Sequence, residues 1–343
     1  MSVEKQFRFI HTADTHLGIG LSKRSKKKTS WHRSQDFMDN FSKVVEEASK
    51  SRIDFLIHAG DVFDRSTPPK HIINAAFSQL FQIARDKPVF LVPGNHERAI
   101  LRTGLLDSFS KLVNFSHPKT VSFKLKGLNI GVTGFPFKRH SFPPQFLSIL
   151  EKTGHENTNF DYKILVMHQL LETATVGSQD FSFSTRHPEV LPLSMIPQSF
   201  DYIALGHVHR YQQFFSQHLR EDIPVVYPGS IERTSFAECY EKKGYIIANV
   251  RINPETDEKN TELIFSELPT RPMYQMEIVV DENKEEETVI MEIEQKLGEI
   301  KRDSIVYFKV LGCTDGALGS LLGNLISEWK KKFQLKILRV KII

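Results

Sequence analysis

The sequence predicts an α/β protein: a two-sheet sandwich flanked by helices, followed by a small α+β domain at the C-terminus. Three observations support this fold class. Five short apolar runs each stop at a polar residue, as buried strands do in α/β proteins. Apolar residues with helical spacing separate the first three runs. Pro269 and Pro272 interrupt regular structure ahead of the C-terminal segment and indicate a linker there.

The first domain is expected to cover residues 1–268. Its five apolar runs are FRFIHTADTH, DFLIHAGD, VFLVPGNHE, KILVMH and YIALGHVH. Two helices are predicted from apolar residues that recur at helical spacing. These are Phe37, Phe41, Val44, Val45 and Ala48 in the first helix and Ile72, Ile73, Ala76 and Leu80 in the second. Further strand-like runs are LNIGVTGF, PVVYPGS, GYIIANVRI and TELIFSEL, so strands outnumber helices in the second half of this domain.

The second domain is expected to cover residues 272–343. Its pattern alternates strand, helix, strand, helix and strand, in the segments YQMEIVV, EEETVIMEIEQKLGEI, SIVYFKVLG, ALGSLLGNLISEWKKKF and LKILRVKII. The second helix carries an apolar face that is suited to packing on a small sheet. That face consists of Leu318, Leu321, Leu322, Leu325, Ile326 and Trp329.

The polar residues at the ends of the five runs have the chemistry of metal ligands. They are two Asp, one Asn and four His: Asp14, His16, Asp61, Asn95, His168, His207 and His209. Carboxylate, amide and imidazole ligands suit Mn, Fe or Zn, and the lack of Cys excludes a thiolate site. Members of the pairs Asp14/His16 and His207/His209 would point the same way on extended backbone. The pattern therefore predicts a metalloenzyme.

These residues resemble the calcineurin-like metallophosphoesterase superfamily, whose pattern is DxH, GDxxD, GNHE or GNHD, a lone His, and GHxH. All five stand in order over about the first 210 residues, with Gly60-Asp61-Val62-Phe63-Asp64 as the second. Within the superfamily the chain is most similar to the Mre11/SbcD DNA-repair nucleases, because of HTADTHLG, GDVFDRSTPP, VPGNHE and a small C-terminal domain. In that family the small domain is a capping domain that helps to present DNA to the metals.

The resemblance implies a role for each ligand-type residue. Asp61 would bridge two metal ions, with Asp14, His16 and His209 on one ion and Asn95, His168 and His207 on the other. His96 would face the phosphate as a catalytic residue, and the ions are expected to be Mn²⁺. Two such ions would activate a shared water and stabilise both oxygens of an in-line displacement at phosphorus.

Other polar residues near the motifs have two readings. A His inside a strand run is more typical of the core than of a metal site, which applies to His58 and His11. Asp64, Arg65 and Glu97 are either partners that orient ligand imidazoles or ordinary loop charges. Arg186 and His187 lie in a loop after the fourth motif, where exposure is commoner than contact with substrate.

A basic run follows the first motif directly. It contains Lys23, Arg24, Lys26, Lys27 and Lys28. Such a run is either a solvated loop or an arm that contacts phosphates beside the scissile bond. Together with the capping domain, it favours DNA over a nucleotide or a phosphoprotein as the substrate.

Composition and the N-terminus indicate a cytoplasmic protein, and the resemblance implies that it is DNA-associated. Among 343 residues, 40% are hydrophobic, 25% are charged and the net charge is +4, which excludes disorder. No apolar stretch approaches the roughly 20 residues of a membrane span, and the N-terminus lacks a signal core. Cys239 and Cys313 fall in different expected domains, which argues against a disulfide framework.

The sequence thus predicts an Mn-dependent DNA nuclease with the family's 3′ to 5′ exonuclease and structure-specific endonuclease activities. One alternative is a related phosphoesterase for cyclic nucleotides, small phosphodiesters or phosphoproteins. Another is a non-catalytic scaffold at DNA ends. The resemblance also implies an ATPase partner of the Rad50/SbcC type and a homodimer. In the family that ATPase binds helices beyond the cap, and no helical pattern follows the last predicted strand.

Overall fold

A computed structural model describes residues 4–20, 33–96, 110–139, 141–156, 159–176, 180–183, 187–215, 219–220, 223–280, 285–312 and 316–342. It divides into two compact units. The first contains residues 1–21, 32–232 and 241–269, and the second contains residues 22–31, 233–240 and 270–343. The basic run at 23–28 and Glu97 lie outside the described residues, as does Arg186. Among the described residues, no helix combines the length and the apolar character that a membrane crossing requires.

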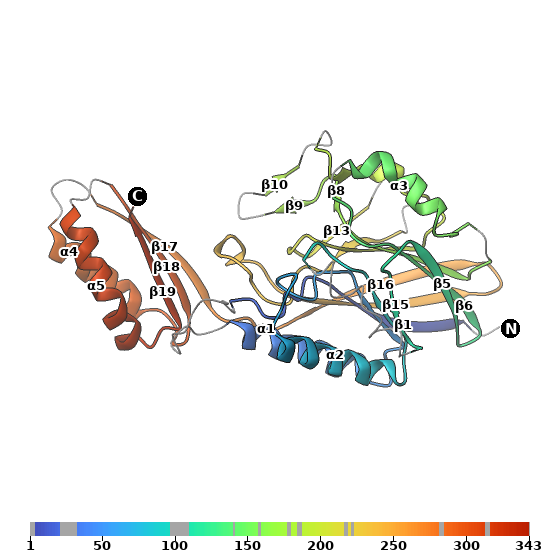
Figure 1. The fold of residues 1–343 in the computed structure, drawn as a ribbon, viewed down its shortest axis with the longest axis horizontal. Helices are drawn as coiled ribbons and strands as arrows, with labels where there is room; N and C mark the ends of the chain where they lie inside the picture. Colours follow the sequence, from blue (N-terminus) through green and yellow to red (C-terminus); the bar gives the residue numbers. More distant parts are fainter. Residues whose placement is uncertain are drawn as a thin grey trace. The chain divides into compact units, whose positions relative to one another are not determined.

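The first unit is built on two six-stranded sheets (Figure 1). One sheet has the order β16 (Glu258–Glu267), β15 (Gly244–Asn253), β1 (Lys5–Thr12), β2 (Phe55–His58), β3 (Val89–Leu91) and β4 (Leu112–Asn114). The other has the order β13 (Gln212–Phe214), β14 (Val225–Tyr227), β12 (Tyr202–Gly206), β7 (Tyr162–His168), β6 (Leu128–Gly134) and β5 (Lys119–Leu125). The predicted two-sheet sandwich is confirmed.

Helices and short strand pairs complete this unit. The helices are α1 (Ser34–Ser49), α2 (Lys70–Ala84) and α3 (Phe142–Glu151). β8 (Leu170–Leu171) pairs with β11 (Val190–Leu191), and β9 (Thr175–Val176) pairs with β10 (Phe181–Ser182). Short 3₁₀ turns cover Leu193–Met195 in this unit and Phe236–Glu238 in the second. Helix α3 was not predicted from the sequence.

Alternating side chains explain the layers of the sandwich. In β1, Phe7 and Phe9 point into the core between the sheets, whereas Ile10 points to the core beneath α1 and α2. In β12, Ala204 likewise faces the other sheet, and Leu205 faces the core that includes α3. The layers are therefore helix, sheet, sheet and helix, and in Figure 1 α1 and α2 lie on the opposite side of the sandwich from α3.

The second unit carries its own sheet and core. Its sheet is parallel, in the order β17 (Met273–Val279), β18 (Ile305–Leu311) and β19 (Ile337–Ile342). The helices α4 (Glu286–Gly298) and α5 (Gly316–Lys332) connect these strands. Trp329 is fully buried in the core and donates from Nε1 to Glu294 Oε1 at 2.8 Å. The order strand, helix, strand, helix, strand agrees with the sequence pattern.

Candidate metal centre

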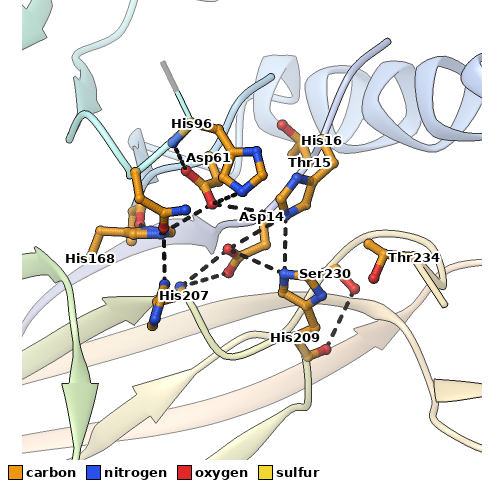
Figure 2. Close-up of polar contacts among 12 residues, drawn as sticks. Asp14, Thr15, His16, Asp61, His96, His168, His207, His209, Ser230 and Thr234 are labelled. Carbon is orange, nitrogen blue, oxygen red and sulfur yellow. Dashed lines mark hydrogen bonds and ion pairs between the residues drawn. The ribbon is translucent and has the colours of Figure 1, made fainter. Parts of the chain in front are cut away.

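The five motifs follow strands whose carboxyl ends meet at one rim of the sandwich. β1, β2 and β3 are parallel neighbours in the first sheet, and their loops carry Asp14, Asp61 and Asn95. β7 and β12 are parallel neighbours in the second sheet, in a register that pairs His168 with Gly206. Because parallel strands end on the same edge, residues far apart in sequence converge there. Figure 2 shows the resulting cluster of carboxylates and imidazoles.

One half of the cluster consists of Asp14, His16 and His209. Their nearest ligand atoms all lie within 4.8 Å of one another. The Nε2 atoms of His16 and His209 are 3.0 Å apart, and each is 3.9 Å from Asp14 Oδ1. The three side chains therefore present a carboxylate oxygen and two ring nitrogens to one small volume.

The other half consists of Asn95, His168 and His207. Asn95 Oδ1 is 3.1 Å from His168 Nε2 and 3.0 Å from His207 Nδ1. His168 donates from Nδ1 to the Ala59 carbonyl at 2.7 Å, so Nε2 is the ring atom that faces the cluster. These three residues therefore share a second volume beside the first.

Asp61 lies between the two halves. Its Oδ2 is 3.3 Å from His168 Nε2 and 4.0 Å from His16 Nε2. Its Oδ1 accepts the backbone N–H of His96 at 3.0 Å. The Asp61 carboxylate therefore lies beside one imidazole of each half.

The backbone around the cluster adopts conformations that most residues avoid. Asp14, His16, Asp61 and His207 have φ angles of 51°, 40°, 54° and 93°. These values lie in the left-handed region, which costs a non-glycine residue roughly 1–3 kcal/mol in sparsely populated conformations. The extended backbone expected for the pairs Asp14/His16 and His207/His209 is therefore wrong. Asp14 and His16 still meet, whereas His207 and His209 serve different halves.

Glycines allow the loops to approach the cluster closely. A Cβ added at Gly94 would collide with both the side chain and the backbone N of Asp61. A Cβ at Gly206 would collide with the Ala59 carbonyl and, at 2.7 Å, with His168 Nδ1. The Gly-Asn and Gly-His steps of the motifs are thus steric requirements of this rim.

Burial and mutual charge set the protonation states of the cluster. Burial lowers the pKa of His207 to about 3 and, with His209 nearby, holds the pKa of His16 well below its usual range. Burial also raises the pKa of Asp14 to about 6. Burial alone would raise the pKa of Asp61, but the charge and hydrogen bond of His168 outweigh it and hold that pKa low. Burial alone would lower the pKa of His168, but the charge and hydrogen bond of Asp61 outweigh it and raise that pKa to about 9.

The donor set fits two divalent metal ions. The Nε2 atoms of His16 and His209 face each other at 3.0 Å, where a single proton at most can lie between them. Neutral imidazole, carboxylate and amide oxygen are the forms that bind Mn, Fe or Zn. Asp14, Asp61 and His168 form a further group whose ligand atoms lie within 4.8 Å of one another. The two carboxylates are therefore close to ligand atoms of both halves.

His96 stands at the edge of the cluster. Its side chain is 36% exposed, and its Nε2 is 3.8 Å from Asp61 Oδ2. Its Nδ1 donates to the Asp64 carbonyl at 2.6 Å, so Nε2 is the ring atom that faces the cluster. Burial raises the pKa of the Asp64 carboxyl, which lies 3.8 Å from Arg65.

The remaining histidines considered from the sequence form their hydrogen bonds with residues outside the ligand set. His11 is buried, with its ring nitrogens 3.0 Å from Tyr202 Oη and 3.1 Å from the Leu205 carbonyl. His58 is buried with Nε2 3.0 Å from Thr15 Oγ1. His187 is exposed, and its Nδ1 accepts the Glu189 N–H at 3.3 Å.

Two residues outside the ligand set, Tyr227 and Lys243, hold the rim from behind, and sequence reasoning missed Lys243. Tyr227 donates to the Gln169 carbonyl at 2.7 Å and accepts the Leu171 N–H at 2.9 Å, directly after His168. Lys243, which is fully buried, donates to the His209 carbonyl at 2.8 Å. Nothing in the segment EKKG distinguishes Lys243 from an exposed turn lysine.

Comparisons with known proteins agree with this arrangement. A family model described as calcineurin-like phosphoesterase matches residues 7–211. The chain is 29% identical over 322 residues to the DNA double-strand break repair protein Mre11 of Methanosarcina acetivorans, covering 92% of this chain and 47% of the relative. It is 25% identical over 338 residues to the protein of the same name from Archaeoglobus fulgidus, covering 88% and 68%. The chain thus spans about half the length of the first relative.

Solved structures show a weaker likeness. A dimetal phosphatase from Danio rerio matches with a TM-score of 0.41 and 12% identity, over 76% of this chain and 98% of the phosphatase. A hypothetical protein from Thermus thermophilus matches with a TM-score of 0.43 and 11% identity, over 77% and 100% of the two chains.

Proposed function

Because the chain belongs to the calcineurin-like phosphoesterase family, we propose that it is a two-metal-dependent DNA nuclease that hydrolyses phosphodiester bonds. Asp14, His16 and His209 would hold one ion, Asn95, His168 and His207 would hold the other, and Asp61 would bridge them. The observation that carries this assignment is the position of Asp61 Oδ2, 4.0 Å from His16 Nε2 and 3.3 Å from His168 Nε2, one residue of each half. The proposed metal is Mn²⁺.

The chemistry follows from this ligand set. When bound, two divalent ions supply a water of lowered pKa and stabilise the charge that develops on phosphorus-bound oxygens. Asp14 and Asp61 are the carboxylates of the set, so the loaded centre would keep a net positive charge that attracts a phosphodiester. The neutral imidazoles of His16 and His207 are ready to bind metal without first losing a proton.

His96 is proposed as the catalytic residue that handles the leaving group. The Asp64 carbonyl accepts its Nδ1–H, which fixes the ring and directs Nε2 toward the cluster. From this atom a protonated imidazole can donate to the leaving oxygen or stabilise its charge. The partial exposure of its side chain leaves room for a substrate phosphate.

DNA is proposed as the substrate on two grounds. The relatives that match most of this chain carry the name DNA double-strand break repair protein Mre11. The basic run Lys23, Arg24, Lys26, Lys27 and Lys28 follows the first motif in the sequence and suits contact with phosphates. The proposed repertoire is 3′ to 5′ exonuclease and structure-specific endonuclease activity in an intracellular repair protein. A Rad50/SbcC-type ATPase and a second copy of the chain are the proposed partners.

A division of labour between two domains belongs to this proposal. Residues 1–268 would carry the phosphoesterase centre, and residues 272–343 would form a cap that presents DNA. In support, the described residues of the ligand set all come from the first compact unit, and the second has its own sheet and core.

The first experiment is release of nucleotides from end-labelled double-stranded DNA with added Mn²⁺, with a chelator control and the Asp61→Asn variant. The proposal expects degradation that both controls abolish, and the labelled end reports polarity. Bis-p-nitrophenyl phosphate is assayed in parallel. Cleavage of this small ester with intact DNA would contradict the nuclease assignment and favour a small-substrate phosphoesterase. Metal-independent DNA binding without cleavage of either substrate would favour the scaffold.

A further inference from the structure

Lys243 occupies an unusual position directly before β15. Its side chain is fully buried, and its Nζ donates to the backbone carbonyl of His209 and to Glu241 Oε2, both at 2.8 Å. A buried ammonium is costly unless it is paired and hydrogen-bonded. The two hydrogen bonds therefore stabilise the buried ammonium, and one of them goes to the backbone carbonyl of a proposed metal ligand.

The His209 carbonyl is held from several directions. Besides Lys243, it accepts the backbone N–H of Ser230 at 3.0 Å and the Ser230 hydroxyl at 3.5 Å. Gly229 has φ of 79°, and a Cβ there would come within 2.7 Å of the same carbonyl oxygen. Figure 2 shows Ser230 beside His209 at the edge of the cluster. The chain around His209 is therefore closely fitted.

Glu241 extends the same contacts to the next residue. Its Oε2 accepts from Lys243, while its Oε1 accepts from Arg210 Nε at 3.0 Å. Arg210 follows His209 directly, and its Nη1 also donates to Thr175 Oγ1 at 3.3 Å. Lys243 and Glu241 thus fix two consecutive residues of the loop between β12 and β13.

His209 depends on this support more than its partners do. Its side chain is 27% exposed, whereas those of His16 and Asp14 are 3% and 0% exposed. Packing restrains the buried ligands, but a part-exposed ligand on a loop needs its backbone held. Residues behind a ligand typically contribute about 10- to 100-fold to metal affinity.

We propose that Lys243 is a positioning residue that sets the backbone of His209 and thereby the affinity of the ion bound by Asp14, His16 and His209. This inference rests on the proposed two-metal function, because it concerns one half of that centre. Lys243 acts through the His209 carbonyl, which belongs to one half only, so its effect should be selective for that half.

The test compares Lys243→Met with a matched control, Lys259→Met. Lys259 is 14% exposed and lies 3.4 Å from both carboxylate oxygens of Asp201, in an ion pair of the same unit away from the ligands. Metal-free wild type and both variants are titrated calorimetrically with Mn²⁺, and their thermal stability is measured without metal. In Lys243→Met, one of two binding steps should weaken by about 10- to 100-fold and the other should stay within about twofold. Lys259→Met should lose stability and keep both steps.

Three outcomes decide between the claims. Unchanged Mn²⁺ binding in Lys243→Met would overturn the positioning role and leave the proposed function intact. If both Mn²⁺ binding steps weaken equally, and do so in Lys259→Met as well, Lys243 has only a general structural role. Failure of the wild type to bind Mn²⁺ would instead refute the two-metal function. If Lys243→Met does not fold, Glu241→Gln tests the same claim, with the same half expected to weaken.

Discussion

The metal rim of the first unit and the turns of the second unit place left-handed residues in opposite environments. In the second unit, the non-glycine residues with φ above zero among those described are Asp303 and Gln334, both exposed in turns between elements. At the rim they include Asp14, His16 and Asp61, all buried. A left-handed Asp in an exposed turn is ordinary, whereas three buried left-handed residues among the proposed ligands are not.

The difference shows that local conformational preferences are followed in the second unit and overridden at the rim. The second unit combines amphipathic helices, a parallel sheet and its own apolar core, so its local preferences and its fold agree. The rim carries backbone strain, crowded imidazoles and an unpartnered, buried His16 Nδ1 within the described part of the chain. Strain of this kind persists only where the surrounding structure enforces it, and it concentrates at functional sites.

Gly94→Ala should break the rim most severely. The added Cβ would collide with the Asp61 side chain and backbone, so the carboxylate that is proposed to bridge the ions must move. Mn²⁺ affinity should fall by more than about 100-fold, beyond the usual cost of losing a residue behind a ligand. Calorimetric titration measures this, with circular dichroism to establish folding. A folded variant with wild-type affinity would contradict the steric account.

Trp329→Ala should damage the second unit and spare the rim. The substitution empties a fully buried site and removes the hydrogen bond to Glu294, at a cost of about 3–5 kcal/mol. Hydrogen exchange resolved by segment should show faster exchange in residues 285–312 and 316–342. Mn²⁺ stoichiometry should remain that of the wild type, and loss of metal binding would show that the two regions are not independent.

Without metal, stability should fall as the pH rises from 6.5 to about 9. The folded-state pKa of His168 is raised from 6.5 to about 9 by Asp61, so its contribution is complete below pH 6.5 and is lost through pH 9. The folded-state pKa values of His16 and His207 are lowered, so these two residues change the stability only below pH 6.5. The expected loss is up to about 3 kcal/mol, from about 1.4 kcal/mol per pKa unit.

Urea unfolding with chelator, at pH 6.5 and at about pH 9, measures this loss of stability. The His168→Gln variant provides the control. The variant should show a flat profile over the same range. A decline that persists in His168→Gln would assign the effect to other groups.

Gly323→Ala should have the smallest effect, and it should stabilise. Gly323 is exposed in α5, and a Cβ there would meet nothing within 4 Å. Replacing a helical glycine by alanine contributes about 0.5–1 kcal/mol. Chemical denaturation measures the gain, and destabilisation would show that helix α5 is not packed as described. The same substitution should thus lower Mn²⁺ affinity at Gly94 and raise stability at Gly323, which sharpens the contrast between the two regions.

Most of the fold was predictable because apolar spacing reports burial directly. Phe37 to Ala48 predicted α1, and the five apolar runs predicted the strands that carry the motifs. Helix α3 was not predicted, because Pro143 and Pro144 suggest a break in the chain. They stand in its first turn, where proline is tolerated since the N–H groups there lack helical partners.

The site was predictable only in part. Ligand chemistry identified the residues that now cluster, but the left-handed backbone of Asp14 and His207 carries no sequence signal. Lys243 was missed because burial of a lysine depends on tertiary packing, and two adjacent lysines suggest a solvated turn. Residues that support ligands through their backbone are visible only once the chain is folded.

The most direct test of the central claim is anomalous diffraction from crystals of this protein grown with Mn²⁺. The account predicts two peaks at the rim, one among Asp14, His16 and His209 and one among Asn95, His168 and His207, with Asp61 contacting both. A single peak, or peaks away from Asp61, would contradict it.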